Sequence, residues 1–173
     1  QCFFDNQFTF TNNSTLAYGS QDYLWNFGDS DTSTQTNEQH SYENDSTFNV
    51  KLVATTNTGC QDSLVKQAIV HPSPVLQINL EKITLCSGSP VQINLSGADY
   101  YHWNNSVGFL SSSSDSDSVV VSPPSTTTYQ IIGENTYSCT DTVNSEVTVF
   151  PLPVVDAGEN DTICYEESTQ LNG

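Results

Sequence analysis

The sequence repeats itself with a period of about 80 residues, and this register constrains the fold more than any other feature. Cys60 and Cys139 stand one period apart, and so do Cys86 and Cys164. This period is longer than that of solenoid repeats, and it matches small all-β domains joined in series. The chain is therefore predicted to be a tandem array of small units.

The register sets the boundaries of these units. The predicted units are residues 1–71, residues 75–150 and the beginning of a third unit over residues 154–173. Pro-x-Pro motifs occupy the predicted linkers at residues 72–74 and 151–153. Such motifs favour extended, semi-rigid backbone, so the units are expected to project in line. Because the third unit stops within its pattern, the sequence is expected to be a piece of a longer chain.

The local patterning predicts β-strands. Several segments alternate apolar and polar residues at every second position, which is typical of a strand with one buried face. These segments are residues 7–11, 48–54, 75–80, 91–95 and 146–150. No segment shows a sustained apolar stripe of helical period, so helix is expected to be nearly absent. The predicted fold class is all-β, with each unit a β-sandwich.

The charge and the motifs exclude several functions. The formal net charge is −17 with three Lys and no Arg, so a phosphate backbone would repel the chain and nucleic acid is not an expected partner. No apolar run is long enough for a direct membrane span in this sequence. The three histidines, His40, His71 and His102, are scattered, and no catalytic motif occurs. We therefore expect that the chain is not an enzyme.

Five cysteines occur without any C-x-x-C spacing, which argues against a zinc or redox site. Each predicted unit begins with an early cysteine, and the first two also hold a late one. The expected disulfides are Cys2–Cys60 and Cys86–Cys139, with Cys164 bonded to a cysteine beyond residue 173. Disulfides persist in oxidising compartments, so the chain is expected to be extracellular. Buried free thiols are the alternative, and a bond between units would contradict the expected pairing.

The first unit contains a Trp-Asn-Phe-Gly-Asp turn at residues 25–29, a His-Ser-Tyr motif at residues 40–42 and a predicted strand at residues 48–54. Through these three segments the first unit resembles the PKD domain family. The resemblance implies an Ig-like β-sandwich. Ser30 stands where the family usually has the last glycine of the turn, so the backbone is expected to differ there.

The second unit resembles the Ig-like repeats found beside PKD domains in secreted proteins of Bacteroidota, through Cys86, Trp103, residues 126–129 and Cys139. The whole array is similar to giant gliding-motility adhesins of the SprB type and to related type IX secretion cargo. This resemblance implies tandem Ig-like/PKD β-sandwich modules in a linear array on the outer cell surface. The implied function is a structural stalk segment of a large cell-surface adhesin or filament, with neighbouring modules of the same chain as partners.

A glycosylation pattern fits the same resemblance. In that phylum, O-glycans are attached at Asp-Ser or Asp-Thr followed by a hydrophobic residue. Four hydroxyl residues match this pattern. They are Ser63, Ser118, Thr142 and Thr162. Because the pattern is short and the chain is rich in Ser, Thr and Asp, chance matches are the alternative.

Calcium is the one cofactor that the sequence raises. Asp29 and Asp31 place two carboxylates in one loop, and hard cations prefer oxygen ligands. The alternative is that these acids keep a secreted surface soluble, because a complete calcium site needs six or more ligands.

The adjacent residues Tyr100 and Tyr101 raise a second function. Neighbouring residues on a strand face opposite ways, so one ring is expected to be exposed, and Tyr101 is the candidate glycan contact. The alternative function is a carbohydrate-binding accessory module of a secreted hydrolase, with a surface polysaccharide as partner. A further alternative is a chain that polymerises into a fibre.

Overall fold

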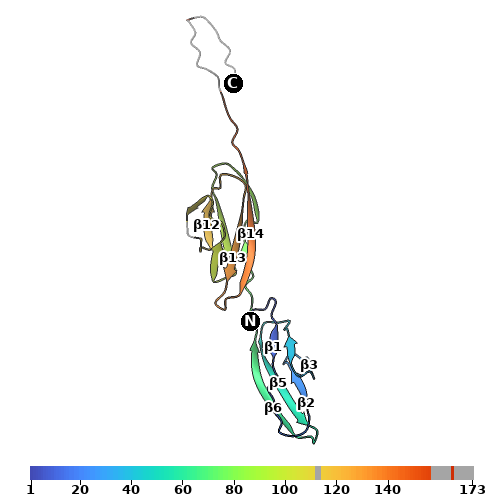
Figure 1. Cartoon of the computed structure of the whole chain (residues 1–173). Helices are drawn as coiled ribbons and strands as arrows, with labels where there is room; N and C mark the ends of the chain where they lie inside the picture. The colour runs from blue at the N-terminus through green and yellow to red at the C-terminus, as the bar shows by residue number, and fades with distance from the viewer. Residues whose placement is uncertain (112–113, 157–164, 166–173) are drawn as a thin grey trace.

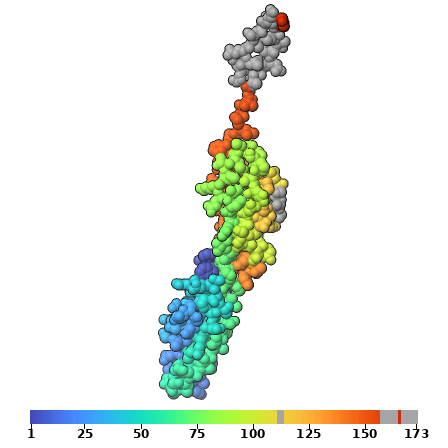
Figure 2. Space-filling view, turned by 180° about the vertical axis from the view of Figure 1, so that it is seen from behind, coloured from blue at the N-terminus to red at the C-terminus, as the bar shows by residue number. Residues whose placement is uncertain are grey.

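The computed structural model describes residues 1–111, 114–156 and 165. These residues form fourteen strands and no helix, which confirms the predicted all-β fold class. No helix in the described ranges is therefore long and apolar enough to cross a bilayer. Two β-sandwiches lie end to end in an elongated molecule (Figure 1), and the view from behind shows the same arrangement (Figure 2).

The first sandwich is formed by β1 to β6. Its strands are β1 (Phe8–Phe10), β2 (Gln21–Asn26), β3 (Thr32–Ser33), β4 (Glu38–His40), β5 (Thr47–Thr56) and β6 (Gln61–Ile69). One sheet has the order β3-β2-β5-β6, and β1 and β4 form the two-stranded opposite sheet. The opposite sheet is short, so it covers only part of the four-stranded sheet.

The second sandwich is formed by β7 to β14. Its strands are β7 (Gln77–Ile78), β8 (Lys82–Cys86), β9 (Val91–Ser96), β10 (Tyr100–Trp103), β11 (Phe109–Ser111), β12 (Ser118–Val121), β13 (Thr127–Glu134) and β14 (Thr140–Phe150). The sheets have the orders β10-β13-β14-β8 and β11-β12-β9-β7. All pairs are antiparallel except β8 with β14, which run parallel.

The core of the first sandwich is mainly aromatic. Its buried members are Trp25, Phe27, Tyr42, Val50, Ala68 and Val70. Each buried polar atom of these rings has a partner, as burial requires. The Trp25 indole donates to the Gln35 carbonyl at 3.1 Å, and the Tyr42 hydroxyl donates to the Phe27 carbonyl at 3.0 Å. Burial, with the negative charge of Asp29, raises the pKa of Tyr42 to about 12, so this hydroxyl keeps its proton.

The core of the second sandwich repeats this plan. Its buried members are Ile93, Leu95, Trp103, Val119, Val121, Tyr129, Ile131 and Val147. Trp103 stands one period after Trp25, and its indole also donates to a loop carbonyl, that of Ser116, at 2.8 Å. The Tyr129 hydroxyl donates to the Val107 carbonyl at 2.5 Å, and burial raises the pKa of Tyr129 to about 12. The repeat in the sequence is therefore a repeat in the cores.

The turn after β2 contains Gly28 and Ser30, both with positive φ, and a backbone that differs from the family pattern stays a prediction. Gly28 has a φ of +87°, and a Cβ at this position would lie 3.0 Å from the backbone N and O of Asn49. Ser30 has a φ of +91°, a conformation that glycine adopts without cost and that strains other residues. Serine thus stands at a position whose backbone favours glycine.

The predicted disulfide pairing is wrong. The structure has the bond Cys2–Cys139, with a Cα–Cα distance of 5.4 Å and a sequence separation of 137 residues. Cys60 and Cys86 are free and exposed. The bond therefore joins the two sandwiches instead of closing each one. Cys164 and most of the predicted third unit, residues 154–173, lie outside the described residues.

The direction of the last strand in each sandwich explains the error. Cys60 precedes β6, whereas Cys2 pairs with His71 beyond the other end of that strand. A nine-residue strand spans about 30 Å, and a disulfide needs Cα atoms within about 7 Å. The same separation holds in the second sandwich, since Cys139 precedes β14 and Cys86 pairs with its last residue.

The junction between the sandwiches contains more than the bond. The rings of His71 and Tyr137 stack with centroids 4.2 Å apart and an interplanar angle of 13°. The Asn135 side-chain amide donates to the Pro72 carbonyl at 2.7 Å. Cys139 is fully buried. The start of the chain also lies here (Figure 1), because the His71 amide donates to the Gln1 carbonyl at 2.7 Å.

Candidate functional site

A groove lies on the first sandwich. It has a volume of about 760 Å³ and lies between β1 and β6, where the short opposite sheet leaves the four-stranded sheet uncovered. Its floor is apolar, from Trp25, Leu52, Ala54 and Leu64. The Leu64 side chain is 63% exposed, which is high for a leucine on the inner face of a sheet.

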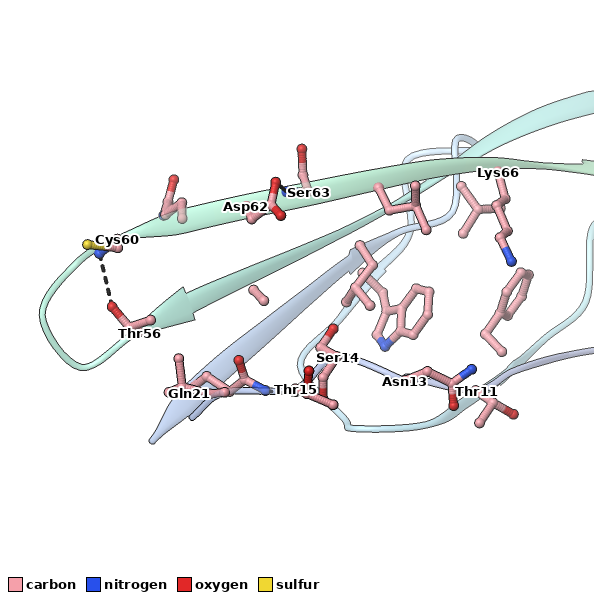
Figure 3. Close-up of a pocket in the computed structure, with 18 of the residues that line it drawn as sticks. Thr11, Asn13, Ser14, Thr15, Gln21, Thr56, Cys60, Asp62, Ser63 and Lys66 are labelled. Carbon is pink, nitrogen blue, oxygen red and sulfur yellow. Dashed lines mark hydrogen bonds between the residues drawn. The ribbon is translucent and has the colours of Figure 1, made fainter. Parts of the chain in front are cut away.

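The rim of the groove is polar and mostly neutral (Figure 3). The labelled hydroxyl and amide side chains are Thr11, Asn13, Ser14, Thr15, Gln21, Thr56 and Ser63. The charged groups are Asp62 and Lys66, both on β6. Cys60 lies at one end, where its amide donates to the Thr56 hydroxyl at 3.1 Å. Such a surface can hydrogen-bond a neutral polar ligand above an apolar floor.

In the described part of the second sandwich, the chain itself covers the place that corresponds to the groove. Asp141 stands one period after Asp62, and its carboxylate accepts the Leu76 amide at 2.8 Å. Ser145, at the position of Lys66, is buried and donates its hydroxyl to the Leu80 carbonyl at 2.7 Å. The segment from Leu76 to Leu80 therefore occupies the seam that is open in the first sandwich.

The sequence-predicted carboxylates Asp29 and Asp31 lie together, and His40 on β4 joins them. The ligand atoms of the three side chains lie within 4.8 Å of one another. Asp29 accepts the Asp31 amide at 3.1 Å through Oδ1 and contacts His40 Nε2 at 2.6 Å through Oδ2. Burial opposes ionisation of Asp29, but the hydrogen bonds from His40 and Asp31 hold the pKa of this carboxyl below its usual value.

This arrangement bears on the calcium prediction. Both oxygens of Asp29 already have partners, and the His40 ring stacks on Phe27 with centroids 4.1 Å apart. Calcium prefers six to eight oxygen ligands, and imidazole is not among them. The cluster fits a structural hydrogen bond between His40 and Asp29 that anchors the turn. Calcium at Asp29 and Asp31 stays a prediction, which a comparison of melting curves in millimolar calcium and in chelator tests.

Three of the predicted glycosylation residues are described, and Thr162 lies outside the described residues. Ser63 on β6 and Thr142 on β14 are at equivalent positions, and the amide of each donates to the preceding aspartate at 2.8 Å. Both are exposed. Ser118 is half-buried, and its hydroxyl donates to Asn94 Oδ1 at 2.8 Å. Ser63 and Thr142 are therefore the more accessible candidates, and occupancy stays a prediction.

One ring of the predicted tyrosine pair is exposed, and it is Tyr100, at 62%. Tyr101 is half-buried and packs against the core of the second sandwich. Its hydroxyl accepts the Ala98 amide at 3.2 Å. The glycan contact predicted at Tyr101 thus falls on the ring that faces inward.

Sequence reasoning missed the groove and the junction. The groove depends on a covering segment that one sandwich has and the other lacks, which no single motif reports. The junction had a usable signal: each late cysteine stands just before the last strand of its unit, well ahead of the Pro-x-Pro motif. This spacing places the late cysteine at the end of the sandwich away from its own C-terminal linker.

Comparison with solved structures finds β-sandwich proteins. A glucan-binding protein of the Bacteroides ovatus mixed-linkage glucan utilization locus, solved with a heptasaccharide, is 10% identical with a TM-score of 0.34, over 87% of this chain and 65% of that one. Fibronectin(III)-like modules of Clostridium thermocellum CbhA are 8% identical with a TM-score of 0.38, over 90% and 91%. Four Ig domains of Dscam1 are 11% identical with a TM-score of 0.36, over 83% and 41%. Similarity at this level carries no information on function.

Comparison of sequences is more specific. No curated protein sequence matches the chain. The PKD domain family model matches residues 5–70, which include the turn at residues 25–29 and all six strands of the first sandwich. Residues 5–70, which form the first β-sandwich, are therefore similar to a PKD domain.

Proposed function

We propose that this chain is a rigid spacer: a structural stalk segment of a large adhesin or filament on the outer cell surface, used in attachment or gliding motility. In this proposal residues 1–71 and 75–150 are the structural units, and residues 72–74 and 151–153 are the linkers. The observation that carries it is the covalent bond Cys2–Cys139 between the two sandwiches. A hinge between freely moving modules would not need such a bond.

Three independent contacts support the stiffness of the junction. Besides the disulfide, the His71–Tyr137 stack and the hydrogen bond from Asn135 to Pro72 cross from one sandwich to the other. All three join the turn at residues 135–139 to Cys2, His71 and Pro72, and together they restrict motion more than a single covalent link, which acts as a pivot. The high negative charge also suits a spacer, because like-charged surfaces keep neighbouring stalks apart.

The free thiols allow a direct test of this proposal. Cys60 and Cys86 lie at opposite ends of the two-sandwich body, and spin labels on them report its length by pulsed electron resonance. With Cys164→Ser to remove the remaining cysteine, we expect one narrow distance distribution centred at roughly 65 Å, from the added lengths of β6 and β14. The Cys2→Ser/Cys139→Ser variant should broaden it. An equally broad distribution with the bond intact would contradict a rigid spacer.

A second candidate is the carbohydrate-binding accessory module, and the groove of the first sandwich favours it. Neutral hydroxyl and amide groups around an apolar floor match an uncharged saccharide, whereas the chain's charge disfavours acidic ones. A glycan array with the whole chain tests this function. Leu64→Asp should abolish saturable binding, and Leu24→Asp, on the outer face of the same sheet and 45% exposed, is the matched control. Binding unaffected by Leu64→Asp would exclude the groove.

A further inference from the structure

Among the described residues, the free cysteines Cys60 and Cys86 occupy positions equivalent to those of the bonded cysteines Cys139 and Cys2. Cys60 ends the turn at residues 56–60, and Cys139 ends the turn at residues 135–139. In each turn the first amide donates to the cysteine carbonyl, at 2.9 and 3.0 Å, and the fourth amide donates to the first carbonyl, at 2.9 and 3.0 Å. The cysteine amide donates to the side-chain oxygen of the first residue, at 3.1 and 3.0 Å. The two turns are therefore built alike.

Cys86 has the same position in the second sandwich as Cys2 has in the first. Cys2 forms a parallel bridge with His71, just after β6, and Cys86 pairs in parallel with Phe150, the last residue of β14. His71 and Phe150 stand one period apart, so the partners of the two early cysteines are themselves equivalent. The bond Cys2–Cys139 thus joins the early cysteine of one sandwich to the turn cysteine of the next.

Cys86 corresponds to Cys2 and Cys60 corresponds to Cys139, but neither Cys86 nor Cys60 is bonded in the structure. Both thiols are exposed, and they lie at opposite ends of the body: Cys60 at the tip of the first sandwich, and Cys86 beside the last residue of the second. We propose that they are covalent docking sites for adjoining units of the same kind. Cys86 bonds the turn cysteine of a following unit, and Cys60 bonds the early cysteine of a preceding one.

The surface around each thiol supports this pairing. At the junction, the residue opposite Cys2 is His71, and its ring stacks on Tyr137 in the neighbouring turn. At the free end, the residue opposite Cys86 is Phe150, whose ring is 56% exposed and available for the same contact. In the turn of the first sandwich, Thr58 stands in the place of Tyr137, so a joint to this turn depends more on the disulfide.

The chemistry of the joint is ordinary thiol–disulfide exchange, with a small disulfide such as oxidised glutathione as the oxidant. The thiolate of Cys60 attacks oxidised glutathione, which gives a mixed disulfide and releases one glutathione thiolate. The thiolate of Cys86 from the second unit then attacks the Cys60 sulfur and releases the second glutathione. Two thiols are oxidised to one disulfide, and one oxidised glutathione is reduced to two thiols.

Two complementary variants test the inference, because copies of this chain then offer one half of the joint each. Both carry Cys164→Ser; one adds Cys60→Ser, and the other adds Cys86→Ser. Each variant is incubated alone and in an equimolar mixture with oxidised glutathione at about 0.15 M salt, which screens repulsion between the two acidic chains. Non-reducing electrophoresis and peptide mapping identify the bonds.

We expect covalent dimers in the mixture, joined through Cys60–Cys86, at least tenfold in excess of either homodimer. Random oxidation would give the mixed bond only twice as often as each homodimer, and this ratio would overturn the inference. Absence of any covalent dimer, or dimers through Cys86 alone, would overturn it as well. The inference extends the proposed spacer to its neighbours, but the tests are separate: the spacer proposal fails on the distance within one chain, and this inference fails on which thiols bond.

Discussion

The His71 imidazole lies flat against the Tyr137 phenol ring across the junction of the two sandwiches, with centroids 4.2 Å apart. His71 follows the last strand of the first sandwich, and Tyr137 lies in a turn of the second. The stack stands beside the Cys2–Cys139 bond, because Cys2 pairs with His71 and Tyr137 is close to Cys139 in the same turn, and we expect it to limit the access of solvent to the bond. Ring pairs of this kind contribute about 0.5–1.5 kcal/mol beyond the area that they bury.

Tyr137→Ala should therefore expose the disulfide. We expect the bond to be reduced by dithiothreitol severalfold faster than in the parent chain, as measured by the appearance of the Cys2 and Cys139 thiols with time. Tyr18→Ala is the matched control, because Tyr18 is 92% exposed and lies away from the junction. Equal reduction rates in the parent chain and in Tyr137→Ala would show that the stack does not shield the bond.

Ser30→Gly should stabilise the first sandwich. The φ of +91° strains serine but not glycine, so the substitution should raise the free energy of unfolding by about 1 kcal/mol, read as an increase in Tm. Ser46→Gly serves as the control, since Ser46 is exposed and is not among the described residues with positive φ. That control should lower the stability, because glycine adds freedom to the unfolded chain. A similar decrease in Tm for Ser30→Gly and Ser46→Gly would contradict the strain at Ser30.

Single-molecule pulling from the two chain ends should hardly extend either sandwich while the bond is intact. Force then passes from Cys2 through the disulfide to Cys139 and along β14, so the residues between the two cysteines carry no load. After reduction, the sequence separation of 137 residues should add a contour length of about 480 Å. Contour-length increments of this size in the absence of reductant would show that Cys2 and Cys139 are not bonded to each other. A Cys2→Ser variant, insensitive to reductant, is the control.

The Asp29–His40 contact should make stability depend on acid pH. Because the pKa of Asp29 is lowered in the folded state, its contribution is present above the pKa of the unfolded chain and is lost as the pH falls through the lower folded value. We expect Asp29→Asn to reduce the Tm at pH 6 and to weaken its decline below about pH 4. Asp45→Asn, at an exposed position, is the control. An unchanged acid limb of the Tm profile in Asp29→Asn would contradict this role.

The sequence predicted the parts of the fold that depend on local pattern. Alternation at every second residue identified strands such as β5 and β9, and the repeated tryptophans, Trp25 and Trp103, both lie in cores. These features are visible because a strand with one buried face alternates apolar and polar residues at every second position of the sequence. The departure from a glycine position at Ser30 was also visible in the sequence, but the strain was not, because it follows from the positive φ in the structure.

The bond and the groove depend on long-range geometry instead. Cys2 lies beside His71, although the two residues are at opposite ends of the sequence of the first unit, and no local pattern predicts this contact. The predicted disulfides joined the two cysteines of the same unit. In the structure these two cysteines lie at opposite ends of the last strand of the unit. Tyr101 shows the same limit, because alternation predicts that one of two adjacent rings faces outward but not which one.

The Cys2–Cys139 bond closes most of the described chain into one covalent ring. A protease that cuts a single exposed turn inside this ring, such as the one at residues 57–59, opens the ring without releasing a fragment. The two pieces stay attached through the sulfur atoms and can remain folded. A protein built in this way stays in one piece after a first cut inside the ring, and only a second cut, or a reductant, separates it into parts.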